Sequence, residues 1–147
     1  MTFHLKLEKI IAIKDSEKTE ALANYNQAVS EFEVVADKLY HYLKQKEELE
    51  NKQTDKLNVG LTVQDIRQYQ EFILNLEKFV SHYQTLVIQA REKMQKLQNE
   101  LVDKNIEVKK YEKLQEKGLQ VFHQARKEDE SKRMDEISLQ LFMNRRN

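Results

Sequence analysis

Apolar residues recur along two long stretches of this chain at alternating intervals of three and four. In the first stretch they are Leu22, Tyr25, Val29, Phe32, Ala36, Leu39 and Leu43. The second stretch is longer and includes Ile66, Tyr69, Ile73, Leu76, Val80, Tyr83, Val87, Ala90, Met94 and Leu97. A period of 3.5 residues is typical of a left-handed coiled coil, with apolar side chains at the a and d positions of each heptad. The pattern predicts two long helices, in which Leu22, Val29, Ala36 and Leu43 are a positions of the first.

One segment between these stretches has the residues of a turn. Asn58 and Gly60 suit the positive φ at a helix C-terminus, and Thr62 can cap a following helix with Asp65 three residues later. A bundle of three or four shorter helices would need breakers that the chain lacks, since it has two glycines and no proline. We therefore predict an all-α fold, a long antiparallel two-helix coiled-coil hairpin. A single domain would span residues 1–147, with helices over about 3–57 and 62–143 and a turn at about 58–61.

The position of the turn also predicts how the helices align. Folding the chain between residues 59 and 60 pairs positions whose numbers add to 119, and every a position then meets a d position. Leu43 would face Leu76 in this register. The same sum places Asp15 against Lys104, which we interpret as a charged pair that fixes the register.

The second helix is predicted to extend beyond its partner. Because the first helix begins near Phe3, the positions that face it end near Glu116. The remaining roughly 30 residues would form an overhanging helix of up to about 45 Å at 1.5 Å per residue. Its apolar stripe is interrupted at Asp129 and resumes at Leu139, so a solvated helix and a docking segment both remain open.

Composition excludes several classes of function. Lys plus Arg and Asp plus Glu number 25 each, so no net charge draws the whole chain to nucleic acid or to an anionic membrane. A chain without cysteine has no disulfides or thiolate metal ligands. The first residues carry acidic side chains and no long apolar run, which predicts neither a signal peptide nor a membrane span. We also find no basic apolar face of the kind that would bind a membrane surface.

The chain shows no pattern typical of catalysis. Its histidines, His4, His41, His82 and His123, lack the spacing of a zinc site. Lys or Arg residues are interleaved with the clustered carboxylates, and a two-helix hairpin has no cleft that would shift their pKa values. We therefore predict a non-enzymatic protein without cofactor, metal or small-molecule substrate, which acts by binding other proteins.

Further apolar residues fall at the g positions that flank the predicted core. They are Ala28, Val35, Tyr42 and Leu49 in the first helix and Phe72, Phe79 and Leu86 in the second. In an antiparallel pair the g positions lie on one side, so these residues are predicted to form an aromatic ribbon, while the opposite flank is mostly polar. An exposed aromatic ribbon is typical of a protein-binding face. A wider helix interface, or dimerisation through the ribbon, is the alternative.

Three segments of the chain resemble the flagellar export protein FliJ family. They are FHLKLEKII at 3–11, YQEFILNLEK at 69–78 and KRMDE at 132–136, of which the second is the most specific. The resemblance covers nearly the whole chain. It implies a coiled-coil component of the bacterial flagellar type III export apparatus with no activity of its own.

The resemblance also implies the partners. They are the hexameric flagellar export ATPase, whose ring a hairpin of this family enters, the membrane export gate protein, and the flagellar export chaperones. The residues expected to bind the export gate are Val35, Tyr42, Leu49, Phe72, Leu76, Phe79, Tyr83 and Leu86. Those expected to bind the ATPase ring lie in the overhang and are Phe122, Arg126, Arg133, Asp135, Glu136 and Leu139. Such a protein is cytoplasmic and reaches the cytoplasmic face of the membrane at the flagellar base through its partners.

Two functions therefore compete. The first is an adaptor that couples an ATPase ring to a secretion gate and assists the delivery of chaperones and their substrates. The second is a structural coiled coil that only associates with itself. A monomer in solution favours the adaptor, and a tight dimer favours the scaffold.

Overall fold

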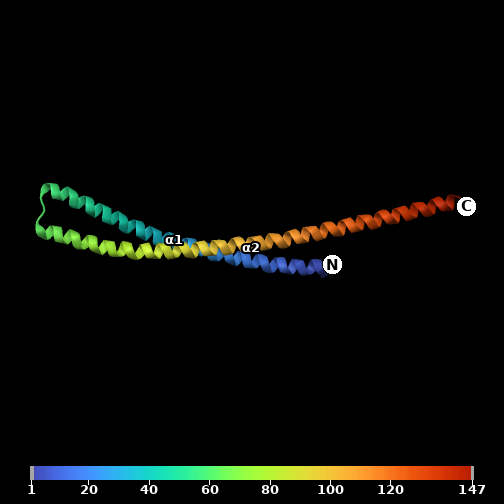
Figure 1. Ribbon diagram of the computed structural model, residues 1–147, viewed down its shortest axis with the longest axis horizontal. Coiled ribbons are helices and arrows are strands. Elements are labelled where there is room, and N and C mark those ends of the chain that lie inside the picture. Colours follow the sequence, from blue (N-terminus) through green and yellow to red (C-terminus); the bar gives the residue numbers. More distant parts are fainter. Residues whose placement is uncertain (1, 147) are drawn as a thin grey trace. The chain divides into compact units, whose positions relative to one another are not determined.

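The computed structural model describes residues 2–146, which form two helices and no strand. Helix α1 spans Thr2–Val59 and helix α2 spans Val63–Arg146 (Figure 1). The two helices pack against each other, so the prediction of an all-α helical hairpin is confirmed. Met1 and Asn147, the ends of the expected domain, lie outside the described residues. Within the described part of the chain, neither helix carries an apolar stretch that could cross a bilayer.

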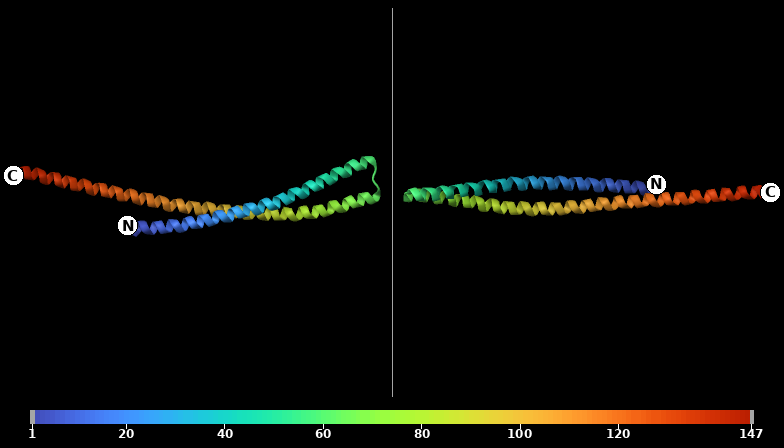
Figure 2. Two further views of the ribbon diagram at one scale, coloured as in Figure 1. Left: turned by 180° about the vertical axis from the view of Figure 1, so that it is seen from behind. Right: turned by 90° about the horizontal axis from the view of Figure 1, so that it is seen from above.

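Each helix contributes to two compact units. Thr19–Val102 forms one unit, which contains the turn and which we call the turn unit. The described residues up to Lys18 and from Asp103 onward form the other, which we call the terminal unit. In both units a segment of α1 pairs with a segment of α2, as the views in Figure 2 also show. The expectation of a single domain stays a prediction.

The turn between the helices is capped on both sides. Gly60 has a φ of 105°, a conformation that glycine adopts without strain, and its N–H donates to the carbonyl of Lys56 at 2.9 Å. On the other side, the N–H of Asp65 donates to Thr62 Oγ1 at 3.2 Å, which is the predicted N-cap. Helix α1 thus continues through Val59, and residues 60–62 make the turn in place of the expected 58–61.

This later turn changes the register of the helices. In the turn unit, Lys93 lies 3.1 Å from Glu31 and Lys46 lies 3.4 Å from Glu77, and the numbers of these pairs add to 124 and 123. The predicted sum of 119 is therefore wrong. Because the chain reverses around residue 61, facing residues have numbers that add to about 122.

The new register selects a different buried stripe on α1. Ala28, a predicted g residue, is only 2% exposed, whereas Leu22 and Leu43 are 43% and 42% exposed. The prediction that Leu43 is buried against Leu76 is therefore wrong, because Leu43 is exposed. On α2 the predicted stripe is retained, and Val80 is 8% exposed. The new register thus moves Leu22 and Leu43 out of the interface and Ala28 into it, while Val29 and Ala36 stay half-buried.

In the terminal unit the paired part ends near Gly118. Leu7 and Val108 are buried upstream of this point, and a Cβ at Gly118 would lie 3.7 Å from the ring of Phe3. Every described side chain from residue 119 to residue 145 is exposed. Helix α2 therefore continues as an overhang, and it reaches Arg146, three residues past the expected end.

Candidate partner-binding surfaces

Tyr42 joins the two helices at one flank of the turn unit. Its ring stacks on those of Phe79 and Tyr83, with centroid distances of 5.1 and 5.3 Å and interplanar angles of 10° and 18°. Stacked aromatic pairs contribute about 0.5–1.5 kcal/mol beyond the burial of their area. The ammonium of Lys38 lies 5.8 Å from the centre of the Tyr83 ring, which adds a cation–π contact. These contacts fix aromatic side chains of both helices in one orientation.

The structure brings part of the predicted aromatic ribbon to the surface. Phe72 and Phe79 are 60% and 49% exposed. The other residues expected to bind the gate are half-buried, and they are Val35, Tyr42, Leu49, Leu76, Tyr83 and Leu86. The α1 members lie deeper than expected because the register places them in the helix interface. We call Phe72, Phe79 and Tyr42, whose ring stacks on Phe79, the aromatic flank. Its role in binding stays a prediction.

A groove beside the turn continues from the aromatic flank. It encloses about 510 Å³ and its lining includes Leu49, Lys56, Leu61, Tyr69 and Phe72. The ammonium of Lys56 lies 5.4 Å from the centre of the Tyr69 ring, and the hydrogen bond between these side chains raises the pKa of Lys56. The sequence analysis did not identify Lys56, because the predicted register does not place it beside Tyr69. Lys56 and Asp65 thus place charged groups in a groove of mixed polarity at the end of this surface.

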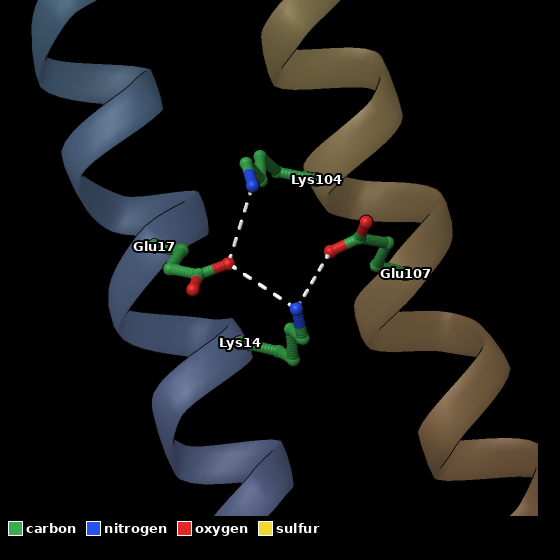
Figure 3. A network of polar contacts seen from close by, with 4 residues as sticks. All are labelled: Lys14, Glu17, Lys104 and Glu107. Atoms are coloured by element: carbon green, nitrogen blue, oxygen red, sulfur yellow. Dashed lines mark hydrogen bonds and ion pairs between the residues drawn. The ribbon is translucent and has the colours of Figure 1, made fainter.

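Four charged residues of the terminal unit form a network across the helices (Figure 3). The ammonium of Lys14 lies 3.2 Å from Glu107 and 3.6 Å from Glu17, and the ammonium of Lys104 lies 3.2 Å from Glu17. All four side chains are partly exposed. A cross-helix network of this kind fixes alignment more reliably than it stabilises the fold.

The network differs from the predicted charge pair. Lys104 pairs with Glu17 in place of the expected Asp15, whose side chain is exposed. The register explains the difference, since the numbers of Lys104 and Glu17 add to 121 and not to 119. The hydrogen bond from Lys104 lowers the pKa of the Glu17 carboxyl, and contact with the Glu107 carboxylate raises the pKa of Lys14. Both shifts favour the charged forms that make the network.

Glu17→Gln should reduce the loss of stability on acidification. Because the pKa of Glu17 is lower in the folded chain, its ion pairs stabilise the fold above the ordinary Glu pKa, and this contribution disappears as the pH falls through the folded value. Thermal unfolding followed by circular dichroism from about pH 7 to about pH 3 measures this dependence. The midpoint should fall less for Glu17→Gln than for the parent. Glu20→Gln, which removes an exposed carboxylate outside the network, should follow the parent, and identical curves for all three would contradict the prediction.

The overhang presents all six residues expected to bind the ATPase ring on an exposed helix. Two ion pairs lie along it, Arg126 with Glu130 and Arg133 with Asp129, each at 3.6 Å and each four residues apart. Such pairs support an isolated helix modestly. Phe122 and Leu139 are exposed, as are further apolar side chains in its last turns, namely Met134, Ile137, Leu141, Phe142 and Met143.

An apolar space lies where the overhang begins. It encloses about 350 Å³ between the start of α1 and the residues of α2 around Gly118, and Phe3, Leu7, Leu119 and Phe122 line it. All of these residues belong to the terminal unit. Phe122 thus extends this apolar space to the first turn of the overhang. Among the described residues, no group of three His, Asp or Glu side chains could hold a metal ion.

Comparison with known proteins identifies related sequences. The sequence model of the family described as Flagellar FliJ protein matches residues 3–147. A flagellar FliJ protein of Bacillus subtilis (strain 168) is 45% identical over 143 residues, which are 97% of this chain and 97% of that protein. No solved structure matches the chain.

Proposed function

The chain belongs to the flagellar FliJ protein family, and on that premise we propose that it is an adaptor that couples the hexameric export ATPase to the membrane export gate. The family takes part in flagellar export and is not enzymatic. An adaptor of this kind needs two separate binding surfaces on one chain. The overhang and the aromatic flank are candidates for these surfaces, and they belong to different units.

The observation that carries the proposal is the exposed overhang. From residue 119 to residue 145 no described side chain is even half-buried, although apolar residues are frequent toward the end. A helix that exposes several large apolar side chains is typical of a segment that docks on another protein. A single helix is also narrower than a helix pair, which suits entry into the central opening of an ATPase ring. The residues that we assign to this contact are Phe122, Arg126, Arg133, Asp135, Glu136 and Leu139.

The aromatic flank supports the contact with the export gate. Phe72 and Phe79 present large ring surfaces to solvent, and Tyr42 supports Phe79 from below at 5.1 Å. Aromatic side chains held in one orientation lose little entropy on binding and often dominate interface energy. In this proposal the chain works in the cytoplasm, is recruited to the membrane at the flagellar base through its partners, and assists the delivery of export chaperones.

Light scattering of the purified chain, alone and mixed with the hexameric export ATPase, tests this function. Alone, the chain should have the mass of a monomer, because its exposed surfaces are kept for other proteins. When the mixture is separated on a size-exclusion column before light scattering, the chain should elute together with the ATPase hexamer. A tight dimer that does not join the ATPase would instead favour the self-associating scaffold.

A further inference from the structure

Helix α2 carries a lysine-rich groove in the terminal unit, on the side that faces away from α1. It encloses about 450 Å³, and its lining residues are Ile106, Lys109, Lys110, Lys113, Leu114 and Lys117. Their spacing places them along one face of the helix. Val108, between them in sequence, is buried against α1, whereas all six groove residues are exposed. We call this surface the lysine groove.

The four lysines of the lysine groove outnumber the three carboxylates on the same turns of α2, which are Glu107, Glu112 and Glu116. None of the four lysine side chains forms an ion pair or hydrogen bond with another described side chain. The nearby carboxylate of Glu107 is already paired with Lys14. Lys109, Lys113 and Lys117 follow one another at intervals of four, an arrangement of like charges that destabilises a helix slightly. In contrast, Arg126 and Arg133 of the overhang have acidic partners on their own helix.

Apolar side chains lie among these lysines. Ile106 and Leu114, eight residues apart, are 58% and 44% exposed, and both line the lysine groove. Residues eight apart lie on the same face of a helix, about 12 Å from each other at 1.5 Å per residue. A ligand that follows this face would meet two apolar contacts with positive charges between and beside them.

We propose that the lysine groove binds an acidic helical segment of a protein partner, one that carries apolar side chains on its acidic face. Acidic side chains would neutralise the unpaired lysines, and the apolar side chains would cover Ile106 and Leu114. A single-stranded nucleic acid fits less well, because the groove has no aromatic ring on which a base could stack. A bilayer also fits less well, because a helix that lies in the membrane interface needs a broader apolar face than two aliphatic side chains. This inference stands independently of the proposed ATPase and gate contacts.

Fluorescence anisotropy with a labelled designed peptide tests the proposal. The probe is a helical peptide with glutamate and leucine on one face, and the matched control peptide has glutamine at each glutamate. The full chain should bind the acidic peptide, and binding should weaken as salt is raised. Lys110→Gln together with Lys113→Gln should weaken it by about tenfold or more, because two charge contacts are lost. Ile106→Gln should also weaken it, which separates apolar docking from charge attraction alone.

The matched protein control is Lys127→Gln together with Lys132→Gln. These lysines are also exposed on α2 and the change in net charge is the same, but they lie outside the groove. This variant should bind the acidic peptide as the parent does. Equal weakening in both double variants would overturn the proposal, as would no effect of Ile106→Gln. Tighter binding to phosphatidylglycerol vesicles or to duplex DNA than to the acidic peptide would also overturn it.

Discussion

Removal of residues 126–147 should leave the helix pair folded and abolish stimulation of the export ATPase. Every described side chain in this segment is exposed, so the truncation removes no buried apolar contact. Circular dichroism should therefore show a thermal midpoint close to that of the parent, with a lower total helix signal. The truncated chain lacks the exposed apolar end of α2, and without it the proposed docking on the ring is lost. ATP hydrolysis by the purified ATPase, measured with and without the chain, gives the functional result.

A shorter truncation is the control for this experiment. Removal of residues 144–147 keeps Leu139 and the other apolar side chains of the last turns, so stimulation should persist. If the longer truncation still stimulates the ATPase, the overhang is not the docking element. A truncated chain that unfolds would instead show that the overhang supports the helix pair.

Phe72→Ala combined with Phe79→Ala should separate stability from binding to the export gate. Phe72 and Phe79 are 60% and 49% exposed, so their removal should cost far less than the about 3–5 kcal/mol typical of a buried phenylalanine. Loss of the stacking of Phe79 on Tyr42 should account for most of the remaining cost. Binding to the gate protein, measured by titration calorimetry, should weaken by more than tenfold, because aromatic anchors dominate interfaces.

The buried control for this experiment is Val80→Ala. Val80 is 8% exposed and lies on the same helix, so its truncation should cost about 1–2 kcal/mol and leave gate binding intact in the folded chain. Leu43, expected to be buried, is 42% exposed and does not serve as this control. If the double phenylalanine variant loses more stability than Val80→Ala, the aromatic flank is part of the core and not a binding surface.

The candidate surfaces were predictable to different degrees. The exposed phenylalanines of α2 follow from its heptads alone, because the α2 stripe is retained in the structure. The overhang follows from the unequal lengths of the two helices. The lysine groove was missed because a search for core periodicity ignores the outward face of a helix. Its signal is present in the sequence, as lysines at intervals of three and four beside Ile106 and Leu114.

The two helices, the single reversal between them and the overhang were predictable from the sequence alone, because these depend on local periodicity and on the few residues that end a helix. The register was not. Helix α1 has two apolar series of period seven, Leu22, Val29, Ala36 and Leu43 beside Ala28, Val35, Tyr42 and Leu49, and either series completes a stripe. The tertiary structure decided between them through the cap at Gly60, which sets where the chain reverses. The rise of the facing sum from 119 to between 121 and 124 then carried Tyr42 into the interface, where it stacks on Phe79 and Tyr83, and placed Lys104 beside Glu17.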